Sequence, residues 1–553
     1  MLPPPPAEQS SRSFAQASRR NALKLGALGL AGLATPLAAQ TGGGSFTHAV
    51  ASGEPGPDRV LLWTRFVASA ETKLVWELSE TQDFAKLAAS GEALASPDRD
   101  WCAKAMATEL MPGRWYYYRF VAPSGEVSPV GRTRTLPVGK VPRFRLAVFS
   151  CSNYGFGWFN AYAHAAEAGD FDLAVHLGDY FYEYQRGEYP SVKQALTERV
   201  LPVDEAVTLA GYRERFATYR TDPDLQRLHQ LYPMISVWDD HEIANDTWAG
   251  GAENHDPATE GDWEARKTAA ARAYREWLPM SDADWAEYPI GKLATLYRLE
   301  TRKAARTKPF DLQETVKDLA PDKVAGALAA FRDGAWQDAR HTLLGATQEA
   351  WLGDGFKRSR GDGATWQVLL QQIVMTNLLL PDVVLETAGP KTPDWLRQRL
   401  TTSVAAAHEG LPWSMDAWDG YPAARQRLQR ASLAAGANLI VLSGDSHNAW
   451  AGNLTLGKER VGVELAGHAV TSPGAEGTLP WLKPQDLAAA LTARNPQLAW
   501  CDTSQRGYLA LELTPQSASG EWRFLQSVRQ KGNVLASSKR MTVLAGQHRF
   551  TTS

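Results

Sequence analysis

The chain has 553 residues, and 61 Asp and Glu against 58 Lys and Arg leave a formal net charge of −3. With 44% hydrophobic and 22% charged residues, this is the balance of an ordinary globular protein, and the charge excludes a nucleic-acid binder that is basic overall. Three cysteines are too few for a disulfide framework, so stability must come from packing or from metal.

The first forty residues have the features of an export signal. Arg19 and Arg20 precede a weakly hydrophobic run, residues 25–39, which ends in small side chains. This run is shorter than the ~20 residues that span a bilayer, and the segment resembles a twin-arginine signal peptide over residues 1–40. We therefore expect the twin-arginine translocase as a partner during export, a periplasmic or secreted location, and no stable membrane or nucleic-acid partner.

The next hundred residues are rich in short β-type runs. Turn signals such as Gly53-Glu54-Pro55 separate them. This spacing predicts a small all-β, immunoglobulin-like sandwich domain over residues 44–142. The expected strands are residues 60–66, 73–78, 101–110 and 114–121.

From residue 143 onward, apolar strands alternate with helical stretches. We expect strands at 144–150, 173–177, 234–237, 367–374 and 439–442, and helices at 158–168, 211–219, 263–277 and 423–435. Such alternation predicts an α/β layered domain over residues 143–553, with function at the carboxyl ends of its strands.

The expected strands end in side chains that carry chemistry. Because strand ends meet in a common crevice, these residues can converge although they are scattered along the chain. Thiol, carboxylate, phenol and imidazole groups together would form an anionic cage for one or more cations. The candidates are Cys151, Asp179, Tyr182, Asp239, Asp240, His241, Asp445 and His447.

Each candidate also has a structural explanation. A lone cysteine such as Cys151 is more often a small buried hydrophobic residue, and Asp179 after a glycine is typical of a turn. The acids that flank His241 are harder to explain structurally, because they would repel one another unless cations or arginines neutralise them. Five strand ends of this kind, the fifth at Glu300-Thr301-Arg302, together favour a metal site.

Three blocks resemble a known family. They are Gly178-Asp179-Tyr180-Phe181-Tyr182, Asp239-Asp240-His241-Glu242 and Gly444-Asp445-Ser446-His447. They are similar to the blocks of the calcineurin-like metallophosphoesterases, and most similar to those of the PhoD-like alkaline phosphatases. The resemblance extends over residues 46–514, and it implies a four-layer sandwich of two mixed sheets flanked by helices.

The resemblance also implies the ligand set. Cys151, Asp179, Tyr182 and His447 would hold Fe³⁺, with Asp179 bridging to a second metal. Asp240 and Asp445 would hold that second metal, where carboxylate ligands favour Ca²⁺. Asp239 would be either a further calcium ligand or a residue that orients His241.

The activity that follows is that of an exported, metal-dependent alkaline phosphatase. A metal-bound oxygen would attack phosphate monoesters, and diesters as well. His241 would either protonate the leaving group or stabilise the transferring oxygens rather than bind metal, and Asp240 and Arg302 are the other catalytic candidates. Asn153, Asn245 and Arg302 would hydrogen-bond the phosphate. For Arg302, a structural ion pair is an equal alternative.

Two other functions are compatible with the sequence. One is a phosphodiesterase or phospholipase D-like enzyme, which would differ in the openness of a cleft bordered by residues 183–204 and 302–343. Basic residues in the latter segment, Arg302, Lys303, Arg306 and Lys308, could bind polyanions. The other is a secreted, calcium-stabilised phosphate- or sugar-binding protein.

Overall fold

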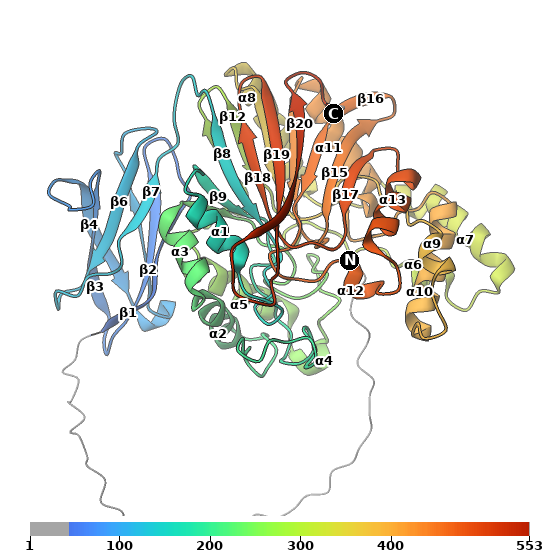
Figure 1. The fold of residues 1–553 in the computed structure, drawn as a ribbon, viewed down its shortest axis with the longest axis horizontal. Coiled ribbons are helices and arrows are strands. Elements are labelled where there is room, and N and C mark those ends of the chain that lie inside the picture. The colour runs from blue at the N-terminus through green and yellow to red at the C-terminus, as the bar shows by residue number, and fades with distance from the viewer. Residues whose placement is uncertain (1–43, 552–553) are drawn as a thin grey trace, which may run out of the picture.

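The computed structural model describes residues 44–551, and the expected signal peptide, residues 1–40, lies outside them. Sheets of nine, seven and four strands organise the chain, and helices pack around the two larger sheets (Figure 1). The mixed α/β organisation expected after residue 143 is confirmed. Among the helices described, none combines the length and the apolar character needed to cross a membrane.

The N-terminal region is all β, as its turn-rich sequence indicates. A four-stranded sheet, in the order β4-β3-β6-β7, packs against three further strands through one hydrophobic cluster that includes Leu62, Leu74 and Tyr118. Leu74 has exposed neighbours along its strand and Tyr118 has partly exposed ones, as expected of strands with one buried face, whereas the neighbours of Leu62 are buried as well. The elements are β1 (Ser45–Gly53), β2 (Val60–Val67), β3 (Thr72–Ser79), β4 (Leu87–Ala95), β5 (Cys102–Ala107), β6 (Trp115–Val121), β7 (Gly131–Arg134) and the short helix η1 (Pro97–Arg99).

Strand β1 joins this region to the nine-stranded sheet. Gly53 pairs in parallel with Met234, so β1, β2 and β5 form one edge of that sheet. A Cβ atom at position 53 would lie 2.4 Å from the carbonyl oxygen of Pro279 and 2.6 Å from that of Met234. Only glycine permits this approach of the two backbones.

The nine-stranded sheet has the order β20-β19-β18-β8-β9-β10-β1-β2-β5. Its centre is the parallel set β8, β9, β10 and β1, which is continued by the antiparallel neighbours β18 on one side and β2 on the other. The remaining strands are β8 (Phe144–Phe149), β9 (Leu173–His176), β10 (Met234–Ser236), β18 (Gly507–Leu513), β19 (Ser517–Leu525) and β20 (Leu535–Leu544).

The seven-stranded sheet has the order β11-β12-β13-β14-β16-β15-β17. Strands β12, β13, β14 and β16 run parallel, and all residues of β13 and β14 are buried, as in parallel strands covered on both faces. Its strands are β11 (Ala286–Ile290), β12 (Ala294–Arg298), β13 (Trp366–Leu370), β14 (Leu439–Ser443), β15 (Ala449–Leu456), β16 (Glu459–Ala466) and β17 (Leu498–Asp502).

A hydrophobic cluster lies between the two large sheets. It combines Leu146 and Val175 of the first sheet with Val368 and Ile440 of the second, all fully buried. Each such side chain stabilises the fold by roughly 1.5–3 kcal/mol relative to an exposed one. This packing holds the carboxyl ends of β8, β9, β10 and β14 at fixed positions.

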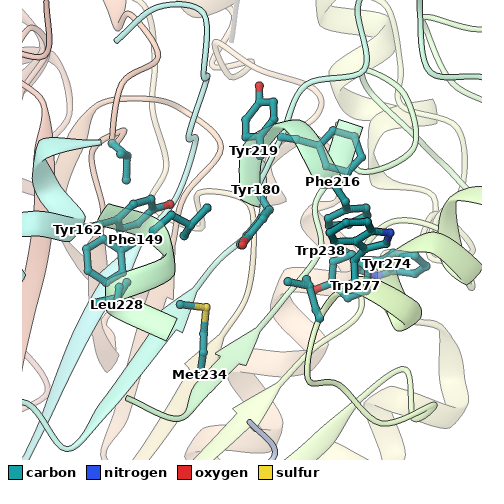
Figure 2. Close-up of a cluster of buried hydrophobic side chains, with 14 of the residues drawn as sticks. Phe149, Tyr162, Tyr180, Phe216, Tyr219, Leu228, Met234, Trp238, Tyr274 and Trp277 are labelled. Atoms are coloured by element: carbon teal, nitrogen blue, oxygen red, sulfur yellow. The ribbon is translucent and has the colours of Figure 1, made fainter. Parts of the chain in front are cut away.

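An aromatic cluster fills the space between the nine-stranded sheet and its helices. Figure 2 shows Phe149 beside Tyr162, and Phe216 beside Trp238, Tyr274 and Trp277. Helix α5 begins where Asp262 accepts a hydrogen bond from the Ala265 amide, and α3 begins at Pro223 after the cap Asp222. The helices are α1 (Asn160–Ala168), α2 (Leu209–Arg220), α3 (Pro223–Leu231) and α5 (Trp263–Trp277), and α4 (Pro257–Glu260) precedes α5.

Other helices cover the seven-stranded sheet and its end. Helices α8 (Gly345–Gly361) and α11 (Pro422–Ala434) pack on its outer face through Phe356 and Leu428. Further helical segments gather beyond β15 and β17 in Figure 1. They are α6 (Leu312–Val316), α7 (Pro321–Asp333), η2 (Ala335–Gln337), α9 (Val383–Glu386), α10 (Asp394–His408), η3 (Trp418–Gly420), α12 (Ala475–Thr478) and α13 (Pro484–Arg494).

Two of the elements that are shorter than expected have an identifiable local cause. The strand expected at 367–374 ends at Leu370, because the Gln371 side chain donates to the carbonyl oxygen of Ile373 and accepts from its amide, which turns the chain. The helix expected at 158–168 begins at Asn160, because the residue before it, Phe159, has a ψ of 45°, outside the helical region.

Candidate metal centre and cleft

Both large sheets present the carboxyl ends of parallel strands to one site. Cys151 follows β8 and Asp179 follows β9, and the two loops are joined by hydrogen bonds from the Cys151 amide to Gly178 (3.1 Å) and from the Ser152 amide to Asp179 (2.8 Å). Asp240 follows β10, and Asp445 follows β14 of the other sheet. The crevice expected at the strand ends is therefore present.

The first group of potential ligands consists of Cys151, Asp179 and His447, whose donor atoms lie within 4.8 Å of one another. All three are buried, and the Tyr182 hydroxyl lies 3.0 Å from Asp179 Oδ2 and 2.9 Å from His447 Nε2. The carbonyl oxygen of Pro473 accepts from His447 Nδ1 at 2.8 Å. This bond leaves the Nε2 lone pair directed at the group, as a metal-ligating histidine requires.

Two further groups are linked to the first in series, through Asp179 and then through Asp240. Asp179, Asp240 and His241 form one, and Asp239, Asp240 and Asp445 form the other. Asp179 and Asp240 each belong to two of the three groups. Such sharing is the arrangement that lets a carboxylate bridge two adjacent cations.

The backbone of these residues is strained. Cys151, Asp179, Asp445 and His447 have φ angles of 58°, 53°, 58° and 60°, in the left-handed region. Each such conformation costs about 1–3 kcal/mol for a residue other than glycine, and such residues concentrate at functional sites. The surrounding sheets therefore hold these side chains in positions that the local sequence does not favour.

The pKa values reflect how closely the acids lie together. Burial raises the pKa of Asp179 well above its ordinary value, and Asp240 and Asp239 add to this against the opposing charge of His241. Burial and Asp179 likewise raise the pKa of the Cys151 thiol and of the Tyr182 hydroxyl. These groups ionise together only if a cation is bound among them.

The donor set fits metal ions. Asp179 Oδ1 and Asp239 Oδ2 are buried without a hydrogen-bond partner among the described residues. A buried carboxylate oxygen without a partner is costly, so each has the character of a ligand atom. Thiolate, phenolate and imidazole suit a transition metal, whereas the carboxylates of Asp239, Asp240 and Asp445 suit a hard cation such as Ca²⁺.

His241 is held by a residue that the sequence analysis did not single out. Its Nδ1 atom lies 2.7 Å from Oε2 of Glu183, which is fully buried. Burial alone lowers the pKa of His241, but the carboxylates of Asp240 and Glu183 outweigh this effect and raise it well above its usual range. The imidazole therefore favours its protonated form, which has a proton to donate.

Glu242 fixes the strand ends by accepting three backbone hydrogen bonds. Its carboxylate accepts from the amides of Asp179 (3.2 Å), Tyr180 (2.5 Å) and Asp239 (2.7 Å). Burial raises its pKa to about 7. The acid that follows His241 in the sequence thus positions ligands rather than serving as one.

Arg302 lies among carboxylates. It donates to Asp239 (2.5 Å), Asp416 (2.7 Å) and Asp445 (3.2 Å), and it is fully buried. Asp416, which the sequence analysis missed, also binds Arg306. This placement favours the structural ion pair that was the alternative for Arg302, and its contact with phosphate remains a prediction.

A cavity of about 770 Å³ opens beside the ligand groups. His241, Asn245 and Asp445 contribute to its wall. Asn153 does not, because its side chain is buried elsewhere. The side-chain oxygen of Asn153 accepts from the backbone amide of Gly155, and its side-chain nitrogen donates to the carbonyl oxygen of Tyr189. Asn245 is therefore the better placed of the two predicted amide contacts.

The cleft border differs in part from the expectation. Residues 184–194 line the cavity, in agreement with the expected border at 183–204, but no residue of 302–343 does. Residues 374–396, 413–419 and 473–481 supply wall residues instead. The expectation that the basic residues of this segment bind polyanions is also wrong for Arg302 and Arg306, because both side chains are buried against Asp416.

The missed residues differ in how visible they are in the sequence. Glu183 directly follows Tyr182 of a recognisable block. An acid next to an expected ligand is a signal from which Glu183 could have been predicted as a site residue. Asp416 lies in a loop without a motif. Only the three-dimensional arrangement brings it to Arg302.

Comparison with known proteins agrees with this geometry. The family model of the PhoD-like phosphatases matches residues 146–522, and the model of the N-terminal domain of PhoD-like phosphatases matches residues 32–137. The chain is 31% identical over 508 residues to alkaline phosphatase D of Bacillus subtilis, covering 89% of this chain and 79% of that protein. It also superimposes on a solved structure of PhoD with a TM-score of 0.74 and 28% identity, covering 92% and 91% of the two chains.

Proposed function

The chain belongs to the PhoD-like phosphatase family, and from that premise we propose that it is an exported, metal-dependent alkaline phosphatase that hydrolyses phosphate monoesters and also diesters. Family membership supports a phosphoric ester hydrolase. The identity of the metals, the details of the reaction and the export route go beyond family membership and are proposed here.

One observation carries the proposal. Asp179 and Asp240 link the three ligand groups into one cluster. Two members of these groups, Asp445 and His241, also form part of the cavity wall. A phosphate in this part of the cavity would therefore meet both the cation site and a proton donor. We assign Fe³⁺ to Cys151, Asp179, Tyr182 and His447, and Ca²⁺ to Asp179, Asp240 and Asp445, with Asp239 as a further calcium ligand.

Bound cations would supply Lewis acidity, which polarises a phosphoryl group and lowers the pKa of a bound water. The chain's own residues would do the rest. Glu183 holds the His241 ring so that a proton can pass from it to the leaving alcohol, and Asn245 is placed to donate a hydrogen bond to a phosphate oxygen. Asp240 accepts hydrogen bonds from the amides of His241 and Asp246, which orient its carboxylate.

The remaining assignments follow the same premise. We propose small-molecule phosphate esters as substrates, and a periplasmic or secreted location reached through the twin-arginine translocase. We also assign a four-layer catalytic domain over residues 143–553 behind an N-terminal β-sandwich, supported by the hydrophobic clusters on both faces of each large sheet.

The size of the cavity favours a second activity at the same site. At about 770 Å³ it has room for the second alcohol group of a diester. A phosphodiesterase or phospholipase D-like enzyme is therefore the alternative within the same chemistry. A calcium-stabilised phosphate- or sugar-binding protein would share the ligand set but would not hydrolyse an ester.

Hydrolysis of p-nitrophenyl phosphate and of bis-p-nitrophenyl phosphate at alkaline pH tests the proposal. We expect product release from the monoester that a calcium chelator abolishes and added Ca²⁺ restores. Faster release from the diester would identify the alternative activity. Full metal occupancy without release from either ester would contradict the proposal and favour a binding protein.

A further inference from the structure

The cavity beside His241 has a second, aromatic part. Trp395, Trp413 and Trp481 contribute to its wall together with apolar residues such as Leu378 and Leu479. The three tryptophans come from separate segments: α10, the loop after it, and the loop between α12 and α13. The fold thus brings large rings together next to the site where the ester bond would break.

These rings are supported from behind and exposed toward the cavity. All three are partly exposed and pack against one hydrophobic cluster that contains Leu380, Leu400 and Leu487. Trp450, which is buried, meets Trp413 edge to face with ring centroids 6.4 Å apart. The tryptophans are therefore held in place before a ligand arrives, which reduces the entropy cost of binding.

The charges in the cavity restrict what the aromatic part can bind. Among its described wall residues, Lys391 is the only lysine or arginine, whereas Glu188, Asp419 and Asp445 are acidic. Asp419 is already bonded to the Leu378 amide and to Arg425. An alcohol carrying further phosphates would find Lys391 as its one lysine or arginine partner among these wall residues and would be repelled by Glu188.

We propose that the tryptophan wall, formed by Trp395, Trp413 and Trp481, is a binding site for a large, uncharged, apolar group on the alcohol side of the phosphate ester. The inference rests on the proposed function and adds the class of substrate. Contact with the rings removes apolar surface from water, and an aromatic group gains further from offset or edge-to-face packing. The volume of about 770 Å³ is far larger than a phosphoryl group needs.

Two pairs of substrates test the proposal on the metal-loaded enzyme. The aryl pair is phenyl phosphate and 2-naphthyl phosphate, and the alkyl pair is n-butyl phosphate and n-decyl phosphate. Within each pair the leaving alcohols have similar acidity, so a difference in kcat/KM reports binding of the larger group. We expect the larger member to be preferred by about tenfold in at least one pair, and the pair concerned identifies the natural group as a ring or a chain.

Single substitutions identify the wall as the cause. Trp395→Ala and Trp481→Ala should each lower the ratio of kcat/KM between the larger and the smaller substrate to roughly a third of the parent value or less. The kcat/KM for the smaller substrate should change by less than about twofold. Trp351→Ala is the matched control, because Trp351 is partly buried on α8 against Tyr297 and lies outside the cavity. Circular dichroism melting shows whether each variant folds, and inhibition by the product 2-naphthol gives a second measure of binding.

The outcomes separate this inference from the proposed function. If all four esters are hydrolysed without preference for size, or if the preference survives both tryptophan substitutions, the wall is not a substrate site and the phosphatase assignment stands. Preference for a hexose phosphate over the naphthyl and decyl esters would also overturn the inference. If no ester is hydrolysed by metal-loaded protein, the proposed function itself fails.

Discussion

The Nδ1 atom of His241 lies 2.7 Å from Oε2 of Glu183, and both side chains are buried beside the ligand groups. The other oxygen of Glu183 accepts from the Asn245 amide (2.8 Å) and from the Asn254 side chain (2.9 Å). Glu183 is thus fixed from two sides and in turn fixes the imidazole. We infer that Glu183 is a positioning residue for His241.

We expect Glu183→Gln to lower kcat for p-nitrophenyl phosphate roughly 10- to 100-fold while KM changes little, because substrate binding is kept but the His241 ring loses its partner. Steady-state kinetics with measured metal content checks this. Glu198→Gln, an exposed acid of the same segment, is the control and should behave as the parent enzyme. An unchanged kcat in Glu183→Gln would contradict the positioning role.

Arg302 gives a prediction about stability. Arg302→Met would remove the guanidinium that Asp239, Asp416 and Asp445 share, although Asp416 keeps Arg306, and losing one partner of a buried ion pair costs about 3–5 kcal/mol. We therefore expect a clear fall in the thermal midpoint, measured by circular dichroism. Arg302→Lys keeps the charge and should lose less. A stable Arg302→Met enzyme with a raised KM would instead assign Arg302 to phosphate binding.

Gly178 precedes the shared ligand Asp179 and has a φ of 105°. A Cβ atom there would lie 2.4 Å from Asp239 Cβ, so Gly178→Ala combines backbone strain with a clash between two ligand loops. We predict a large loss of bound metal and activity. Gly169→Ala also changes a glycine with positive φ, but its nearest neighbour is 3.6 Å away, and it should keep its metal. Equal metal loss in both variants would contradict the argument.

Buried histidines predict lability in acid. Burial, assisted by Arg220 and Arg65, lowers the pKa of His48 to about 3, against an ordinary value near 6.5. Between these values the unfolded chain binds a proton that the folded chain does not, so stability falls as pH decreases from about 6.5 toward 3, by up to about 1.4 kcal/mol per pH unit. The thermal midpoint should drop over this range.

The substitution His48→Gln separates this effect from other titrations. It removes the proton linkage at position 48, so we expect its thermal midpoint to fall less between pH 7 and pH 5 than that of the parent protein. Exposed His408, changed to Gln, is the control for replacing a histidine at the surface. The same acid loss in both variants would show that His48 does not contribute.

Much of the catalytic fold could be predicted from local pattern. Continuous apolar runs marked β8, β9, β10 and β14, and the helix expected at 263–277 is α5 over the same residues. The site residues could be predicted because each follows a strand end. The spacing of apolar residues along the chain indicates whether a segment forms a strand or a helix. These strands and this helix follow that local signal.

Relations between distant elements could not be predicted in this way. The pairing of Gly53 with Met234 joins the N-terminal strands to the nine-stranded sheet through a backbone contact that leaves no periodic signal. The guanidinium of Arg302 donates hydrogen bonds to three acids that lie far apart in the sequence. The border of the cavity likewise depends on where the loops around Trp395 and Trp481 pack.

The central claim is that Cys151, Asp179, Asp240, Asp445 and His447 hold cations that act on a phosphate ester. Elemental analysis of the protein purified without added metal, together with its visible absorption spectrum, tests this most directly. The account predicts bound iron with calcium, a thiolate- and phenolate-dependent absorption band, and loss of that band with the iron in Cys151→Ser. A colourless, iron-free protein that hydrolyses phosphate esters at full rate would contradict it.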